Sequence, residues 1–189
     1  MIRIGVLGDI GSGKSYVAKL FGYPVFNADI EVSKLYKNSK KCYYKLQKEL
    51  PDYIKSFPIK KKQLFKAILF NSKNLKKISK IIHPEIRERL KNFIKKNRYK
   101  KFVVLDIPLL LENKINKKND ILIFIDGSKK EINKRLKKRK KINTKILKKF
   151  QLALEFKRKK ANYVIKNNFK HNTVKKNVKR IIKEILLNA

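Results

Sequence analysis

The chain has 189 residues, one cysteine and a formal net charge of +38. This length suits one α/β domain with a small inserted subdomain, and a single cysteine excludes an intrachain disulfide. No apolar run approaches the roughly 18 residues that a membrane span requires, and the first residues lack the layout of a signal peptide. We therefore expect a protein of the reducing cytosol, with no membrane partner and no structural zinc site.

The positive charge comes from 52 Lys and Arg residues against 14 Asp and Glu residues. Such an excess attracts nucleic acids, but only 8 of the 52 are Arg, the better ligand for bases and phosphates, and the lysines are spread along the chain. Asn and Ile are also frequent, and Lys, Asn and Ile share A/T-rich codons. A biased genome explains the charge, so we expect no specific nucleic-acid partner.

In chain order, short apolar runs at 2–7, 24–26, 102–105, 121–125 and 163–166 predict strands. Helical periodicity predicts a helix from Lys14 to near Gly22, several helices over 30–100, a long basic helix over 129–156, and a closing amphipathic helix over 174–187. Within 30–100, one helix is expected to stop before Pro84, with a new one over 84–97. The alternation predicts an α/β fold with a doubly wound parallel sheet and a helical insertion.

The segment GDIGSGKS at 8–15 has the pattern G-x-x-x-x-G-K-[ST], with a predicted strand before it and a predicted helix after it. Glycines allow successive backbone N–H groups to surround a phosphate chain, the lysine reaches the β- and γ-phosphates, and the final hydroxyl binds Mg²⁺. The pattern predicts an ATP site with Mg²⁺, formed by Gly8, Gly11, Ser12, Gly13, Lys14 and Ser15.

Two acids follow predicted strands on the carboxyl edge of the sheet, where ligands of open α/β sheets bind. Asp29 can accept the proton of an attacking hydroxyl, and Asp106 can hold Mg²⁺. Each acid has an alternative role as a helix cap. After Asp106 the segment IPLLLE turns at Pro108, and Glu112 is a candidate for orienting a substrate.

A P-loop indicates a nucleoside triphosphate but not the reaction. The length and the helical insertion favour a small-molecule kinase, and a guanine-reading N-K-x-D motif is absent. Two alternatives remain open: a kinase of the nucleoside monophosphate type, and a basic nucleic-acid-binding protein with a vestigial P-loop.

Several further segments make the resemblance specific: NAD at 27–29, IIHP at 81–84, LDIPLLLE at 105–112, Arg135 with Arg139, and ANYVIKNN at 161–168. With the P-loop, they resemble the dephospho-CoA kinase family in order and spacing over nearly the whole chain. The resemblance implies transfer of the ATP γ-phosphoryl group to the ribose 3′-hydroxyl of dephospho-CoA, the final step of coenzyme A synthesis. It also implies a P-loop core (1–29, 101–128 and 157–189), a helical CoA-binding insertion (30–100) and a lid (129–156), and we expect a monomer.

Carried over residue by residue, the resemblance implies that Asp29 is the catalytic acid or base and that Arg139 closes on the phosphates, helped by Arg135. Without the resemblance, these two arginines suit a solvated helix face. The resemblance also places Tyr16 beside the phosphates, Asn167 near the adenine, and His83 at the acceptor pocket or its hinge. A lone histidine is more often structural.

The sequence departs from the family pattern at several positions. Asp9 replaces a P-loop glycine, Asn27 replaces the first acid of the D-A-D motif, and Asn162 replaces a later Asp. An acid at position 9 would repel ATP unless its side chain points away from the phosphates. These departures bear on the catalytic rate more than on the type of reaction.

Overall fold

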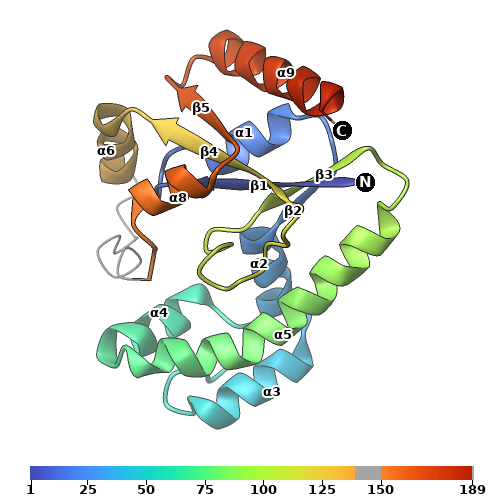
Figure 1. Cartoon of the computed structure of the whole chain (residues 1–189). Coiled ribbons are helices and arrows are strands. Elements are labelled where there is room, and N and C mark those ends of the chain that lie inside the picture. Colours follow the sequence, from blue (N-terminus) through green and yellow to red (C-terminus); the bar gives the residue numbers. More distant parts are fainter. Residues whose placement is uncertain (139–149, 189) are drawn as a thin grey trace. The chain divides into compact units, whose positions relative to one another are not determined.

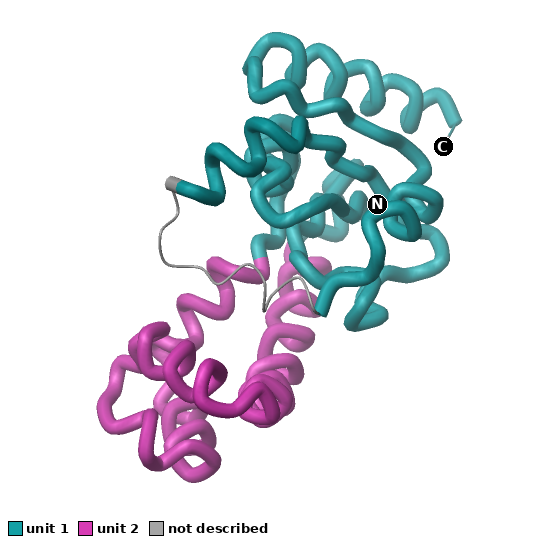
Figure 2. Tube along the Cα trace, turned by 90° about the vertical axis from the view of Figure 1, so that its left-hand side faces the viewer, with its two compact units in different colours: residues 1–27, 97–189 teal, residues 28–96 magenta. Residues whose placement is uncertain are grey.

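The computed structural model describes residues 1–138 and 150–188. The chain divides into two compact units, residues 1–27 with 97–189 and residues 28–96, drawn in different colours in Figure 2. The sequence expectation for the helical insertion was 30–100. Within the described ranges, no helix combines the length and the hydrophobicity needed to cross a bilayer.

The first unit contains a five-stranded sheet in which every pair of neighbours is parallel, in the order β2-β3-β1-β4-β5. Its strands are β1 (Ile2–Gly8), β2 (Val25–Asn27), β3 (Phe102–Asp106), β4 (Ile121–Gly127) and β5 (Tyr163–Asn167). Figure 1 shows this sheet with its flanking helices. The predicted α/β class with a parallel sheet is confirmed, and all five predicted strands are present.

Helices pack on both sides of the sheet, as in a doubly wound fold. Helices α1 (Lys14–Leu20) and α9 (His171–Leu187) share one buried apolar cluster with alternate residues of the strands. On the other face, the side chain of Leu110 lies directly over Gly5, where a Cβ atom would come within 2.5 Å of it. Helix α8 (Leu154–Lys160) packs against β1 and β4.

The segment predicted as one helix over 129–156 is only partly helical in the described residues. Helix α6 spans Lys129–Lys138, and the chain at Phe150–Ala153 is not helical before α8 begins. Residues 139–149 of this segment lie outside the described residues, and Lys137 before them is exposed. The hydrophobic periodicity predicted the helical type but not this interruption.

The second unit is helical, with α2 (Ala28–Asn38), α3 (Lys40–Glu49), α4 (Lys61–Phe70) and α5 (Lys73–Lys96). Helix α5 packs against the other three. The predicted break at Pro84 is wrong, because Pro84 lies inside the continuous helix α5. A proline removes one backbone donor, but buried Ile78, Ile82, Ile86 and Leu90 repeat at helical spacing across it and keep the helix continuous. In α4, Leu64 is buried whereas Leu69 is exposed.

Candidate active site

The P-loop connects β1 to α1, and its glycines adopt backbone angles that other residues rarely take. Gly8, Gly11 and Gly13 have φ angles of +142°, +84° and +91°. A Cβ atom on Gly8 would lie 2.7 Å from the carbonyl oxygen of Ile125 in the neighbouring strand. Only glycine therefore allows the loop to leave the sheet on this path.

Lys14 begins α1, and its ammonium group folds back over the loop. Its Nζ donates hydrogen bonds to the carbonyl oxygens of Gly8 at 3.2 Å and Asp9 at 2.8 Å. Ser15 follows in the first turn of α1, with its side chain exposed. The loop thus carries an ammonium and a hydroxyl group at adjacent positions, the pair that a nucleotide phosphate with its cation requires.

Asp9, the acid in place of a family glycine, is bonded to its own loop. Its Oδ1 accepts a hydrogen bond from the backbone N–H of Ile10 at 2.6 Å. The backbone carbonyl of Asp9 accepts from the N–H of Ser12 at 3.2 Å. The carboxylate therefore stabilises the turn of the loop, in the manner common for Asp side chains in turns.

Asn167, at the end of β5, ties the P-loop to the sheet. Its Nδ2 donates to the carbonyl oxygen of Ser12 at 2.8 Å, and its Oδ1 accepts from the N–H of Phe169 at 2.9 Å. The side chain is buried, and both of its polar ends are bonded to protein. Asn167 therefore shapes the loop, and the adenine contact that the resemblance implies stays a prediction.

The hydroxyl of Ser12 is buried and has no hydrogen-bond partner in the described part of the chain. Buried polar groups in native proteins are nearly always satisfied, so an unpaired hydroxyl at this point indicates a ligand or a water. It lies in the loop that the sequence assigns to phosphate.

Side chains from α6 and the β5–α9 connection border the loop. Ile132 and Leu136 of α6 lie within 3.4 Å of the position that a Cβ on Gly11 would take. The guanidinium group of Arg135 lies 4.0 Å from the centre of the Phe169 ring, a cation–π contact. Arg139 lies outside the described residues, so its predicted role remains a prediction.

Tyr16, the residue after Ser15, is exposed and pairs with a histidine that the sequence did not single out. The distance between Tyr16 Oη and His171 Nδ1 is 2.7 Å, and the two rings meet edge to face. His171 begins α9, 155 residues further along the chain. No local motif predicts this contact, because only the packing of α9 against α1 brings the two rings together.

At the end of β2, Asn27 lies opposite Asp106 of β3 in the parallel register. Its Nδ2 donates a hydrogen bond to Oδ2 of Asp106, which is buried. Asp106 is the last residue of β3 and begins no helix, so the alternative role as a helix cap does not apply. An amide at position 27 is a donor, whereas the family's acid at that position would repel a second carboxylate unless one were protonated.

Asn162, a third departure, also keeps its hydrogen bonds. Its Oδ1 accepts from the N–H of Leu122 at 2.8 Å, and its own N–H donates to the carbonyl of Leu122. An amide oxygen therefore replaces the acceptor that a carboxylate would supply, without adding a charge.

The segment after β3 forms a series of turns that carries Pro108 and Glu112, both half-buried. Oε1 of Glu112 accepts hydrogen bonds from Lys157 Nζ at 2.6 Å and from the backbone N–H of Leu152 at 3.0 Å. Lys157 belongs to α8, far away in sequence, and the predicted motifs did not include it.

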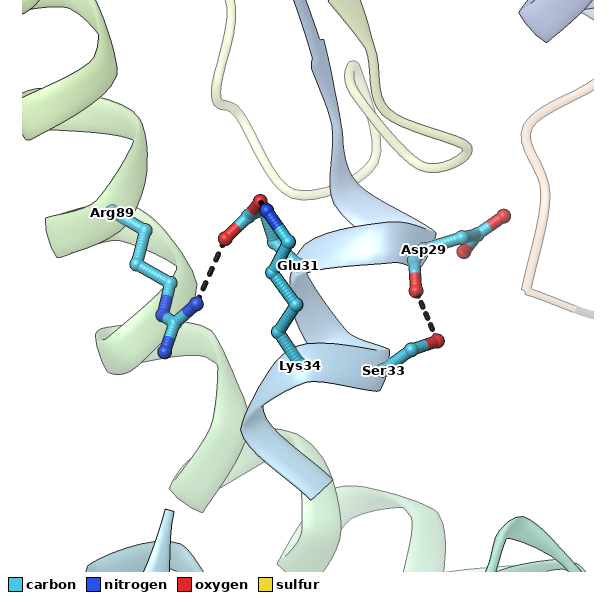
Figure 3. A network of polar contacts seen from close by, with 5 residues as sticks. All are labelled: Asp29, Glu31, Ser33, Lys34 and Arg89. Atoms are coloured by element: carbon cyan, nitrogen blue, oxygen red, sulfur yellow. Dashed lines mark hydrogen bonds and ion pairs between the residues drawn. The ribbon is translucent and has the colours of Figure 1, made fainter. Parts of the chain in front are cut away.

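Asp29, the predicted catalytic acid, lies in the helical unit. It is exposed and is the second residue of α2, so it is not the residue that precedes and caps the helix. Its backbone carbonyl accepts from Ser33 Oγ at 2.6 Å. Figure 3 shows its carboxylate pointing away from Glu31 and Arg89 on the opposite side of the helix.

Glu31 binds Lys34 at 2.6 Å and Arg89 of α5 at 2.8 Å, which links α2 to α5 (Figure 3). Burial alone would raise the pKa of Glu31, but the hydrogen bonds and charges of the two cations outweigh it and lower the pKa below its ordinary value of 4.5. The ionised pair therefore stabilises the folded form of this unit.

This pKa leads to a pH-dependent prediction. Because the pKa of Glu31 is lower in the folded state, its contribution to stability is complete above pH 4.5 and is lost as the pH falls through the folded value. Glu31→Gln is expected to lower the free energy of unfolding by about 1 kcal/mol at pH 7 and by less in acid. Urea unfolding from pH 3 to 7 measures this, with the exposed Glu88→Gln as control. Equal effects at both ends of the pH range would contradict the prediction.

His83 lies on α5 and is half-buried. Burial and the nearby charge of Arg87 lower the pKa of its imidazole below the ordinary value of 6.5, which favours the neutral ring. A neutral ring offers a hydrogen bond but no charge to a phosphate. This agrees better with a role in shaping the unit than with binding an anion.

The described residues contain no group of three or more His, Cys, Asp or Glu side chains that is arranged to hold a metal ion by itself. Mg²⁺ that arrives with a nucleotide needs only one or two protein oxygens and keeps water and phosphate as its other ligands. The hydroxyl of Ser15 and the carboxylate of Asp106 are hard oxygen donors of this kind, so the residues present fit the ion.

These features define a class. A parallel sheet with a P-loop after its first strand, a helical unit inserted after the second and a basic helix bordering the loop is the construction of a small P-loop kinase. The dephospho-CoA kinase family model matches residues 2–173. The chain therefore belongs to the dephospho-CoA kinase family.

Individual proteins and solved structures are similar to this chain over nearly its whole length. The chain is 32% identical over 195 residues to the dephospho-CoA kinase of Wolbachia pipientis, covering 98% of this chain and 99% of the relative. A crystal structure from Thermus thermophilus has a TM-score of 0.77 at 26% identity, covering 99% of this chain and 97% of that one. The dephospho-CoA kinase of Campylobacter jejuni has the same fold, with a TM-score of 0.66 at 23% identity and coverage of 97% and 96%.

Proposed function

We propose that this chain transfers the γ-phosphoryl group of ATP to the ribose 3′-hydroxyl of dephospho-CoA, giving coenzyme A and ADP. Membership of the family carries this proposal, and the P-loop supports it with its buried, unsatisfied Ser12 hydroxyl. The positive charge of the chain attracts both substrates, which are polyanions.

The P-loop would bind the phosphates of ATP through its backbone N–H groups and Lys14. The ammonium of Lys14 now bonds to two carbonyl oxygens of the loop, and it would exchange them for β- and γ-phosphate oxygens. Ser15 and Asp106 would hold the Mg²⁺ ion, which neutralises phosphate charge in such reactions. Arg135, fixed by the Phe169 ring, would contribute a further cation.

Asp29 would receive the proton of the attacking 3′-hydroxyl or hold that hydroxyl in line with the γ-phosphate. It lies two residues after Asn27, which ends β2. Glu112, Pro108 and His83 would shape the site of the acceptor. Residues 28–96 would bind the CoA part, and residues 129–156, including Arg139, would form the lid. A monomer in the cytosol remains a prediction from the sequence.

The test is phosphoryl transfer from Mg·ATP with two acceptors, dephospho-CoA and AMP, followed by mass analysis of the products. We expect a mass increase of one phosphate on dephospho-CoA and none on AMP. Phosphorylation of AMP instead would favour the alternative kinase class. Transfer to neither acceptor would overturn the proposed function for this chain.

A further inference from the structure

A buried ion pair joins two segments that border the candidate site. Lys157 of α8 is 1% exposed, and its ammonium lies 2.6 Å from Oε1 of Glu112, whose side chain is 10% exposed. The same oxygen accepts the backbone N–H of Leu152 at 3.0 Å. Oε2 of Glu112 is buried with no hydrogen-bond partner within the described ranges.

This arrangement is poorly suited to adding stability. Burying two charges costs solvation free energy, and well-packed apolar side chains of similar volume often replace such pairs without loss. The unsatisfied Oε2 adds to the cost. The pair does, however, fix the position of the turn after β3 relative to the start of α8. Apolar contacts alone would allow a wider range of positions, because they have no preferred direction.

The turn that Glu112 closes is the one that begins at Asp106. Between them, Leu110 is fully buried against Gly5, so packing holds the middle of the turn and the charge of Lys157 holds its far end. Leu152 lies at the end of the segment assigned to the lid. One side chain therefore ties the end of that segment to the turn that carries the proposed acceptor residues.

We propose that Lys157 is a positioning residue for phosphoryl transfer, which acts by holding the Glu112 carboxylate and, through it, the turn 107–112 and the backbone at Leu152. This inference rests on the proposed function, because the readout is the formation of CoA. Lys157 touches neither substrate in this role, so its removal affects the geometry of the acceptor site and leaves the P-loop intact.

Lys157→Met, which keeps the length of the side chain and removes its charge, is expected to lower kcat at least tenfold. The KM for ATP is expected to change less than threefold, because the P-loop and its contacts with Asn167 are not involved. The KM for dephospho-CoA is expected to rise. A parent-like kcat in this variant would overturn the proposal.

The double variant Lys157→Met with Glu112→Gln separates positioning from folding. The single variant leaves a buried carboxylate unpaired, which destabilises the fold, whereas the double variant removes both charges. We expect the midpoint of urea unfolding to recover toward that of the parent, while kcat stays low. Recovery of kcat together with stability would make the pair merely structural, as would failure of both variants to fold.

The neighbouring Arg158→Met is the matched control. Arg158 also pairs with an acid, Asp126 at 2.9 Å, but both side chains are exposed, at 52% and 36%. Exposed ion pairs contribute little to the free energy of unfolding, so kcat and stability are expected to stay near the parent values. If the parent itself forms no CoA, the proposed function fails. If the parent forms CoA and Lys157→Met has the same kcat, only this inference fails.

Discussion

Replacing Asp29 by Asn is expected to lower kcat for CoA formation by about a thousandfold, within the range that general acid–base groups contribute. The amide keeps the shape of the side chain but cannot accept the proton of the 3′-hydroxyl. Because Asp29 is exposed and Asn keeps the shape of its side chain, the fold is expected to persist. Steady-state kinetics with both substrates, alongside urea unfolding, measures the two effects.

The expected effects on KM and kcat distinguish a loss of chemistry from a loss of ATP binding. The KM for ATP should change little, since the P-loop is untouched, and most of the loss should appear in kcat. Asp52→Asn, an exposed acid of the same helical unit, is the control and should behave like the parent. An Asp29→Asn enzyme with the parent's kcat would keep the family assignment and remove Asp29 from the chemistry.

Replacing Gly13 by Ala is expected to weaken ATP binding more than a hundredfold and to lower the free energy of unfolding by about 2 kcal/mol. Gly13 has a φ angle of +91°, and a Cβ atom there would lie 2.4 Å from Nδ2 of Asn167. The methyl group therefore forces out the amide that holds the carbonyl of Ser12. Calorimetry with Mg·ATP and urea unfolding measure the two losses.

Gly22→Ala is the matched control for this prediction. Gly22 also has a positive φ angle, +72°, but nothing lies within 4 Å of the position of its Cβ. The control carries the backbone strain without the collision, so we expect about 1 kcal/mol of destabilisation and unchanged ATP binding. Parent-like ATP binding by Gly13→Ala would show that the hydrogen bond from Asn167 to the carbonyl oxygen of Ser12 does not set the shape of the loop.

The five strands and the P-loop could be predicted because their signals are local. Continuous apolar runs mark strands buried on both faces, and the spacing of glycine, lysine and serine marks a phosphate loop wherever it occurs. Pro84 shows the limit of local rules. A proline predicts a helix boundary, but the apolar contacts of Ile82 and Ile86 on either side of it keep α5 continuous.

By itself, the amino-acid sequence determined the fold class, the P-loop motif and the family. The strands and the P-loop are local patterns, and the family's motifs follow one another in order along the chain. Only the tertiary structure decided that Asn167 holds the loop, that Tyr16 meets His171 and that Lys157 closes on Glu112. The physical reason is the same in each case. Contacts between residues tens of positions apart depend on how helices pack on the sheet, and no local periodicity encodes the partner of a buried polar group.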